Sequence, residues 1–331
     1  LQLREALNEP PRLYAIDTRS KREALVCDPN PGLMSKFALG KAERRSGVSR
    51  LGRRWDARLI YPPRYVPGQR YPLVIQSSYS GLGSPFNLYG ASASVAGLGP
   101  TPVAPYPGQA LASRDIVVLQ LDAHATTGAS EAETYRAAFE DAIDHLDEEG
   151  LIDRSKVGLL GFSRNGYYVE HALVHSSVRF AAAVVTDHFN PGYFATALFD
   201  WHEPAIEVIG AAPFGEALAE WLAKAPAFNA EKVQTPLRII GQSLGSSLNV
   251  LSQWELFSRL RYLRKPVEFY LMPGIDRHGG HNTQNPAQII ALQQGVIDWF
   301  DFWLNGREDD QPARREQYAR WRALRERAPG S

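Results

Sequence analysis

Ser163 lies at the centre of the most informative pattern in the sequence. The stretch 161–166, Gly-Phe-Ser-Arg-Asn-Gly, follows an apolar run and precedes a helix-compatible segment. A strand, a sharp turn and a helix with a serine at the apex form the nucleophile elbow of hydrolases, which aims backbone N–H groups at a developing oxyanion. The usual spacing is G-x-S-x-G, but Asn165 replaces the second glycine and Gly166 follows it. Asn tolerates positive φ better than most residues, so the pattern predicts a strained but possible turn.

Two histidines in a glycine-rich loop are candidate general bases for this serine. Neutral imidazole can take and return a proton near pH 7, and α/β-hydrolases carry serine, acid and histidine in that order. His278 and His281 follow the last predicted strand, where this order places the base, and we favour His281. The alternatives are two surface histidines without a catalytic role, or a metal site that includes Asp276.

The catalytic acid is the weakest part of the pattern. It should follow the predicted strand 237–240, but the loop 241–250 contains no Asp or Glu. Glu255 is the first carboxylate downstream, and its longer side chain would let it reach the histidine from a position set back in the next helix. The alternatives are that Glu255 is an ordinary carboxylate near a helix N-terminus, that Asp276 is the acid, or that a Ser–His dyad works without one.

Two donors are predicted for the oxyanion hole. The backbone N–H of Arg164 follows the serine, as elbow geometry requires, and the phenol of Tyr79 follows a buried strand on the loop that faces the elbow. A packing role is the alternative for Tyr79. Aromatic residues after the elbow are candidates for an apolar substrate pocket or for the core. They are Tyr167, Phe189, Tyr193, Phe194 and Trp201.

Buried apolar runs alternate with helical patterns from residue 55 onward, and they predict the elements that must position these residues. The expected strands are 57–61, 71–78, 115–122, 157–160, 180–186, 237–240 and 267–272, and the expected helices are 131–149, 167–175, 253–263 and 286–304. This alternation predicts the α/β class, with a mostly parallel sheet covered by helices on both faces. Together with the elbow it predicts the α/β-hydrolase fold. The Gly-, Ala-, Pro- and Ser-rich stretch 79–113 is typical of a lid or binding loop.

The two ends of the chain carry different patterns. Residues 10–31 predict a β-hairpin with a polar turn at 18–21. A lone hairpin is not stable, so we expect it to belong to a larger β-structure that this chain does not contain. The polar, basic segment 31–54 predicts a linker, and the charged tail 306–331 predicts a surface helix.

Composition excludes several function classes. The chain has 331 residues, is 44% hydrophobic and has a formal net charge of zero, so it shows no electrostatic footprint for nucleic acid or an anionic membrane. The single cysteine, Cys27, excludes an internal disulfide and a thiolate metal site. No apolar run is long enough to span a bilayer. The chain begins with leucine, so the lack of a signal peptide says little about its compartment.

The sequence resembles the catalytic domain of prolyl oligopeptidase-family serine peptidases over roughly residues 55–305. The stretches that carry the resemblance are 59–75 followed by Tyr79, 141–166, 235–240 with 265–268, and 299–304. The hairpin at 10–31 is similar to the last β-propeller blade of that family. The resemblance therefore implies a propeller remnant and linker at 1–54, a catalytic domain at 55–305 and a tail at 306–331.

Two positions depart from the family pattern. Relatives carry G-x-S-x-G-G at the elbow, where this chain has Asn165, and a catalytic aspartate where this chain has Ser247. The sequence also resembles a subgroup, the lasso-peptide isopeptidases, that departs at the acid too. This resemblance implies a glutamate as the acid and so supports Glu255.

These observations predict a serine peptidase that hydrolyses short peptides through an acyl-enzyme on Ser163, with His281 and Glu255 completing the triad. No metal or organic cofactor is expected. The expected partners are a short peptide substrate and either a missing propeller segment or a second chain, but no nucleic acid. The alternatives are an esterase on the same fold and a non-catalytic hydrolase-like binding domain.

Overall fold

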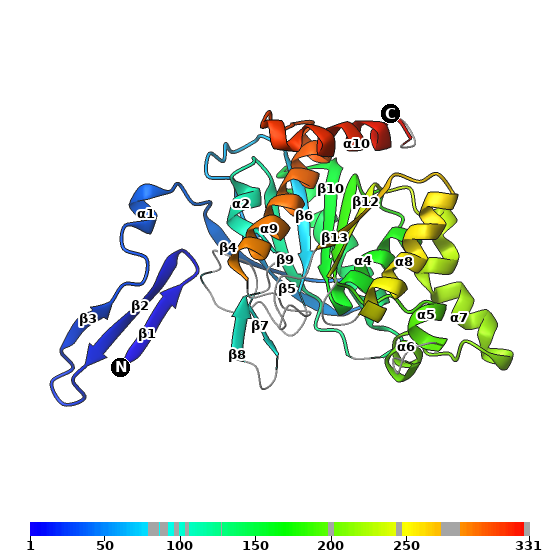
Figure 1. Ribbon diagram of the computed structural model, residues 1–331. Helices are drawn as coiled ribbons and strands as arrows, with labels where there is room; N and C mark the ends of the chain where they lie inside the picture. The colour runs from blue at the N-terminus through cyan, green and yellow to red at the C-terminus, as the bar shows by residue number, and fades with distance from the viewer. Residues whose placement is uncertain are drawn as a thin grey trace.

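A computed structural model describes residues 1–78, 86, 92–95, 99–102, 106–126, 128–197, 202–242, 247–272 and 285–327 (Figure 1). Its centre is an eight-stranded sheet in the order β13-β12-β11-β10-β6-β9-β5-β4. The strands are β4 (Ala42–Val48), β5 (Arg54–Ile60), β6 (Tyr71–Ser77), β9 (Val117–Asp122), β10 (Ile152–Phe162), β11 (Ala182–Thr186), β12 (Leu237–Gln242) and β13 (Val267–Met272). Neighbours from β13 to β9 are parallel, whereas β5 and β4 are antiparallel additions at one edge.

Helices cover both faces of this sheet, as expected for buried, mostly parallel strands. One face packs on α3 (Glu131–Glu148), α4 (Arg164–His175), α7 (Leu218–Lys224) and α8 (Ser247–Tyr262). The other packs on α2 (Gly108–Ala112), α9 (Pro286–Phe300) and α10 (Arg315–Arg325). The remaining elements are α1 (Leu33–Lys36), β7 (Ser92–Val95), β8 (Gly99–Pro102), α5 (Tyr193–Ala197), α6 (His202–Ile209), η1 (Gly215–Ala217), η2 (Pro226–Lys232), η3 (Asp301–Asn305) and η4 (Pro312–Arg314). Within the described residues, no helix combines the length and apolar character needed to cross a membrane.

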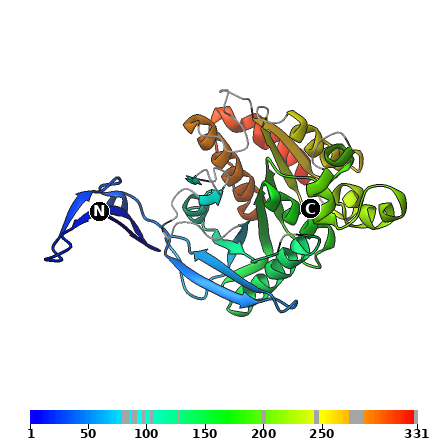
Figure 2. The ribbon, with the colours of Figure 1, turned by 90° about the horizontal axis from the view of Figure 1, so that it is seen from below.

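The N-terminal strands form a separate antiparallel sheet. It contains β1 (Gln2–Ala6), β2 (Glu9–Ile16) and β3 (Glu23–Cys27) in that order, and it projects to one side of the body (Figures 1 and 2). Its contact with the body runs through the turn between β1 and β2. There the side chain of Asn8 donates to the carbonyl of Ala42 and accepts from its N–H, at 2.8 and 2.7 Å. The predicted hairpin is therefore confirmed, with one further strand.

The predicted strands and helices of the sheet are confirmed, although several are longer than predicted: β10, for example, spans Ile152–Phe162 rather than 157–160. β4 lies within the segment predicted to be a linker. It is an edge strand in which every second residue is exposed and only Ala42 is buried, so its sequence is polar and basic rather than apolar. Helix α8 begins at Ser247, earlier than the predicted 253, because the Ser- and Asn-containing start of this helix carries no apolar period.

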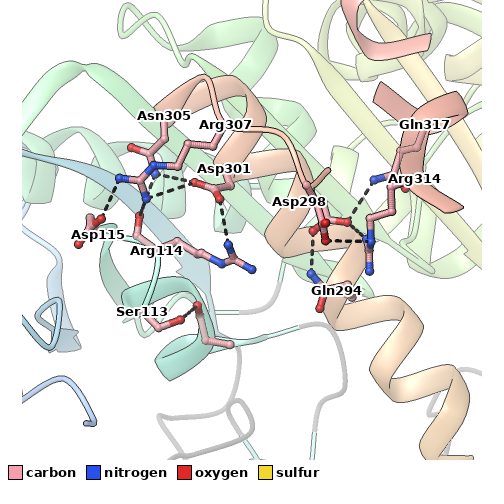
Figure 3. A network of polar contacts seen from close by, with 12 residues as sticks. Ser113, Arg114, Asp115, Gln294, Asp298, Asp301, Asn305, Arg307, Arg314 and Gln317 are labelled. Atoms are coloured by element: carbon pink, nitrogen blue, oxygen red, sulfur yellow. Dashed lines mark hydrogen bonds and ion pairs between the residues drawn. The ribbon is translucent and has the colours of Figure 1, made fainter. Parts of the chain in front are cut away.

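The charged C-terminal segment is tied to the body by the polar network in Figure 3. Asp298 of α9 pairs with Arg314 and accepts hydrogen bonds from Gln294 and Gln317. Helix α10 also buries Trp321 completely. The predicted tail helix is thus formed, with one face packed on α9 and η3.

Candidate active site

The chain turns sharply at Ser163, between the end of β10 and the start of α4. Ser163 has φ 57° and ψ −132°, a conformation that is strained for a residue with a side chain. The turn brings the first residues of α4 back over Gly161, where an added Cβ would lie 2.5 Å from the carbonyl oxygen of Asn165. Glycine at 161 is therefore a requirement of the turn. This is the geometry of a nucleophile elbow.

Gly166 is needed for packing against the segment that follows β11. An added Cβ at this position would lie 2.1 Å from Cβ of His188. The same segment holds the serine directly, because the N–H of Phe189 donates to the carbonyl oxygen of Ser163 at 3.2 Å. The displaced glycine of the motif thus lets the first turn of α4 lie against His188.

Asn165 does not adopt the positive φ that its replacement of a glycine suggested. It lies in the first turn of α4, and the strained residue is Ser163 itself. The buried side chain of Asn165 instead accepts a hydrogen bond from the hydroxyl of Ser77 at 2.8 Å. Asn165, the residue that departs from the family motif, therefore links the elbow to the end of β6 without deforming the turn.

Sequence reasoning missed a tyrosine that joins the same two strands. The buried hydroxyl of Tyr106 donates to the carbonyl of Ser77 at 2.6 Å and accepts from the N–H of Phe162 at 3.0 Å. Burial raises the pKa of this phenol, so it remains a neutral donor. Tyr106 follows a proline- and glycine-rich stretch without helix or strand periodicity, so the sequence pattern did not indicate its role.

The predicted oxyanion donors lie next to these contacts. The N–H of Arg164 is the first of α4 and so has no acceptor within the helix. Tyr79 lies outside the described residues, but its neighbour Ser78 is fixed by a hydrogen bond from its N–H to the carbonyl of Leu121 at 2.7 Å. The side chain of Arg164 turns toward α3, where its Nε donates to Glu131 at 2.7 Å.

Glu255 is buried in the third turn of α8, so the alternative of a carboxylate at the helix N-terminus does not apply. Its carboxylate accepts from the N–H of Phe194 at 3.1 Å and pairs with Arg259 at 2.8 Å. An added Cβ at Gly192 would lie 2.1 Å from Oε2 of Glu255. The carboxylate therefore packs on the same segment, 187–194, that holds the carbonyl of Ser163.

The candidate bases fall outside the described residues, as do their alternatives. His278, His281 and Asp276 lie in the stretch 273–284, and Trp201 in 198–201. The predicted triad therefore stays a prediction at its histidine. Across the part of the chain that the structure describes, no group of three or more His, Cys, Asp or Glu residues could hold a metal ion.

The aromatic residues after the elbow differ in exposure. Tyr167 is 2% exposed and its hydroxyl faces the carbonyl of Val208, so its ring is part of the core. Phe189 is 8% exposed and packs edge-on against Tyr167. Tyr193 is 39% exposed and Phe194 is 38% exposed. Of the candidates that the structure describes, Tyr193 and Phe194 therefore present the most surface to solvent.

A buried acid–histidine pair lies beneath the elbow and was not predicted. Nε2 of His188 lies 2.6 Å from Oε1 of Glu170 on α4, and both side chains are almost completely buried. Burial raises the pKa of Glu170 above its ordinary value of 4.5, although the histidine opposes the shift. The two residues are distant in sequence, and only the fold brings them together.

The raised pKa of Glu170 predicts a pH-dependent stability. Because folding favours the protonated form of Glu170, this group contributes most to stability below pH 4.5. The contribution is lost as pH rises through the raised pKa. Glu170→Gln cannot ionise, so its free energy of unfolding should gain on that of the wild type as pH rises, by at most about 1.4 kcal/mol per pH unit. Urea unfolding of both proteins between pH 5 and 8 measures the gain. Parallel curves would contradict the prediction.

The elbow and its sheet define the class of protein. A strained serine between a central parallel strand and a helix is the arrangement of α/β-hydrolases. An acylaminoacyl peptidase from Pyrococcus horikoshii has the same fold, with a TM-score of 0.68 at 17% identity over 94% of this chain and 49% of that one. The fold predicted from the sequence is thus confirmed.

The chain belongs to the prolyl oligopeptidase family, whose model matches residues 107–307. It is 31% identical to the lasso peptide isopeptidase AtxE2 of Asticcacaulis excentricus, over 97% of this chain and 46% of that protein. The apo structure of AtxE2 has a TM-score of 0.76 at 30% identity and is matched over 98% of this chain and 49% of that one. A variant with Astexin3-dC4 bound gives the same score at 28% identity. The family resemblance is confirmed, and this chain spans about half the length of the curated relative it matches.

Proposed function

We propose that this chain is the catalytic part of a serine peptidase that hydrolyses peptide or amide bonds of short peptides. The observation that carries the proposal is the strained turn at Ser163, with the N–H of Arg164 at the start of α4 beside it. Membership of a peptidase family and similarity to an isopeptidase support amide bonds as the substrate class. The exposed rings of Tyr193 and Phe194 are proposed to line the apolar side of the substrate site.

The proposed reaction runs through an acyl-enzyme. Oγ of Ser163 attacks the carbonyl carbon while its proton passes to His281, and the oxyanion accepts from the N–H of Arg164 and the hydroxyl of Tyr79. His281 then protonates the leaving nitrogen as the C–N bond breaks. A water attacks the resulting ester, gives its proton to His281, and Ser163 recovers that proton as the carboxylic acid leaves. Glu255 is proposed to hold His281 in the orientation and tautomer that this shuttle needs.

The rest of the protein's organisation is also a proposal. Because the chain covers about half of its relative, a propeller segment or a second chain is proposed to complete the substrate site. The division into 1–54, 55–305 and 306–331 belongs to the same proposal.

A fluorophosphonate probe tests the function directly, because it reacts only with an activated serine. We expect one adduct, located on Ser163 by mass spectrometry, absent from Ser163→Ala and slowed by about 10³-fold or more in His281→Ala. His278→Ala is the matched control and should label at the wild-type rate.

The possible outcomes separate the competing functions. If a folded protein forms no adduct, the chain is a non-catalytic binding domain or is inactive without its missing partner, and the proposal fails for this chain. If Ser163 labels but only a p-nitrophenyl ester is cleaved, and no matched peptide anilide, the esterase alternative is correct.

A further inference from the structure

The hairpin of β7 and β8 lies within the stretch 79–113, whose composition is typical of a lid or binding loop. Its strands are antiparallel, and their register sets Ser92 opposite Pro102 and Ser94 opposite Pro100. Among the residues that the structure describes, β7 and β8 pair only with each other. Each strand therefore has an outer edge at which a further strand could be added.

The segment that carries this hairpin is tied to the elbow at both of its ends. The chain leaves the main sheet at the end of β6, where the hydroxyl of Ser77 donates to the side chain of Asn165 at 2.8 Å. It returns at Tyr106, whose hydroxyl accepts from the N–H of Phe162 at 3.0 Å. Asn165 and Phe162 lie on either side of Ser163 in the chain, so the segment begins and ends beside the proposed nucleophile.

The base of the hairpin is also near the elbow. Pro102 precedes Tyr106 by four residues, and four residues of extended chain reach at most about 14 Å. Ser92 lies opposite Pro102, about 5 Å from it at Cα. Figure 1 shows the hairpin below the main sheet, on the side toward which the arrow of β6 points. The hairpin thus stands at the edge of the sheet from which α4 begins.

The prolines of β8 determine which backbone groups face outward. In an antiparallel pair, opposed residues alternate between those that exchange two hydrogen bonds and those that exchange none. Because proline has no N–H, Pro100 and Pro102 cannot exchange two bonds with the serines opposite them. The bonded pairs are therefore the intervening ones, Ala93 with Thr101 and Val95 with Gly99.

The two outer edges consequently differ in their hydrogen-bonding groups. On β8 the outward positions are Pro100 and Pro102, so the described part of this edge offers carbonyl groups and no N–H. On β7 the outward positions are Ser92 and Ser94, and each of them offers an N–H and a carbonyl. A ladder of hydrogen bonds needs both donors and acceptors, so the edge of β7 is the one that can accept another strand.

We propose that the peptide substrate binds as a third strand along the outer edge of β7, hydrogen-bonded to the main chain of Ser92 and Ser94. This inference rests on the proposed function, and it defines the substrate class as an extended peptide segment recognised through its backbone. The occupant is the substrate because the segment that carries β7 is tied at both ends to the residues around Ser163. Recognition through the main chain also tolerates many side chains.

Strand addition has a consequence that a side-chain pocket does not share. Successive N–H groups of a strand point to opposite sides, so only every second N–H of the peptide faces β7. A peptide that keeps alternate N–H groups still has one complete edge. A peptide that lacks several consecutive N–H groups has none, although the number of groups removed is the same.

The first experiment compares such peptides on the Ser163→Ala variant, which cannot cleave them. A library of acetylated and amidated eight-residue peptides, each about 27 Å long when extended, is made in three forms. One is unmethylated, one is N-methylated at positions 2, 4, 6 and 8, and one is N-methylated at positions 3 to 6. Mass spectrometry measures the bound fractions. We expect the alternating form to bind within about threefold of the unmethylated one, and the consecutive form to bind about tenfold more weakly.

The second experiment locates the added strand on β7. Ser94→Pro, placed in the Ser163→Ala background, removes an outward N–H and none of the bonds between β7 and β8. All three forms of the library should then bind equally weakly. Pro100→Ala is the matched control, because it changes the residue opposite Ser94 and alters only the outer edge of β8. It should keep the difference between the forms, and urea unfolding verifies that both variants are folded.

Each result decides a separate point. Equal binding of the alternating and consecutive forms, or binding of neither, would overturn strand addition. A difference that survives in Ser94→Pro would overturn the role of β7. A dimer that Ser94→Pro dissociates in sedimentation would show that a second copy occupies this edge, and would overturn the substrate as its occupant. Fluorophosphonate labelling of Ser163 decides the proposed function independently, because this small probe has no peptide backbone to add to the hairpin.

Discussion

Replacing Gly166 with alanine should destabilise the protein by about 3 kcal/mol or more and abolish labelling of Ser163. In an exposed helix the same change stabilises by about 1 kcal/mol, because glycine is a poor helix former. Here the new methyl would lie 2.1 Å from Cβ of His188, a distance that non-bonded carbons do not reach. His188 cannot retreat easily, since it is buried against Glu170 and its carbonyl accepts from Gln253 at 3.2 Å. Overpacking of this kind forces backbone shifts.

Urea unfolding gives the sign of this effect. A variant as stable as the wild type, or more stable, would mean that helix propensity dominates and that the contact with His188 is soft. The double variant with His188→Gly supplies the control, because it removes the clashing atom. The two changes together should cost less than the sum of the single changes, and strict additivity would show that the residues do not meet.

Glu255→Gln should lower kcat by about 10²- to 10⁴-fold while leaving KM within a few-fold of the wild type. The amide keeps an acceptor for the N–H of Phe194 but loses the charge that would stabilise a protonated His281 and fix its tautomer. Steady-state kinetics with a fluorogenic peptide, or the rate of fluorophosphonate labelling, measures the loss.

Arg259→Gln is the matched control for this variant. It breaks the same ion pair, 2.8 Å long, from the other side and leaves the carboxylate in place. We expect it to keep most of the activity and to lose stability. If both variants lose activity equally, Glu255 acts through its ion pair and is not the catalytic acid. If Glu255→Gln keeps full activity, the acid is Asp276 or the enzyme works as a Ser–His dyad.

The central sheet could be predicted because its strands are buried on both faces. Apolar runs such as 71–78 and 115–122 allow few structural interpretations other than a buried strand. A glycine-flanked serine after such a run allows even fewer other than a nucleophile elbow. β4 was not predicted, since an edge strand with one open face carries charges that are also typical of a linker.

The supporting contacts of the site depend on pairings that local patterns do not carry. Asn165 meets Ser77 across two strands, and Tyr106 joins the ends of the same strands from a segment with no periodicity. The register of the edge strands sets Arg44 against Arg58, and a shift of one residue would place these side chains on opposite faces. The sequence contains these residues, but only the assembled fold brings them into contact.

The segment 187–194 contacts both ends of the proposed charge relay. Its N–H at Phe189 holds the carbonyl of Ser163, and its N–H at Phe194 holds the carboxylate of Glu255. Ser163 and Glu255 are 92 positions apart in the chain, so small errors in position would accumulate through the several elements between them. Because the serine and the glutamate are both hydrogen-bonded to one short piece of backbone, such errors largely cancel. A displacement of the segment carries the serine and the carboxylate together, and their separation is preserved even where their absolute positions are not.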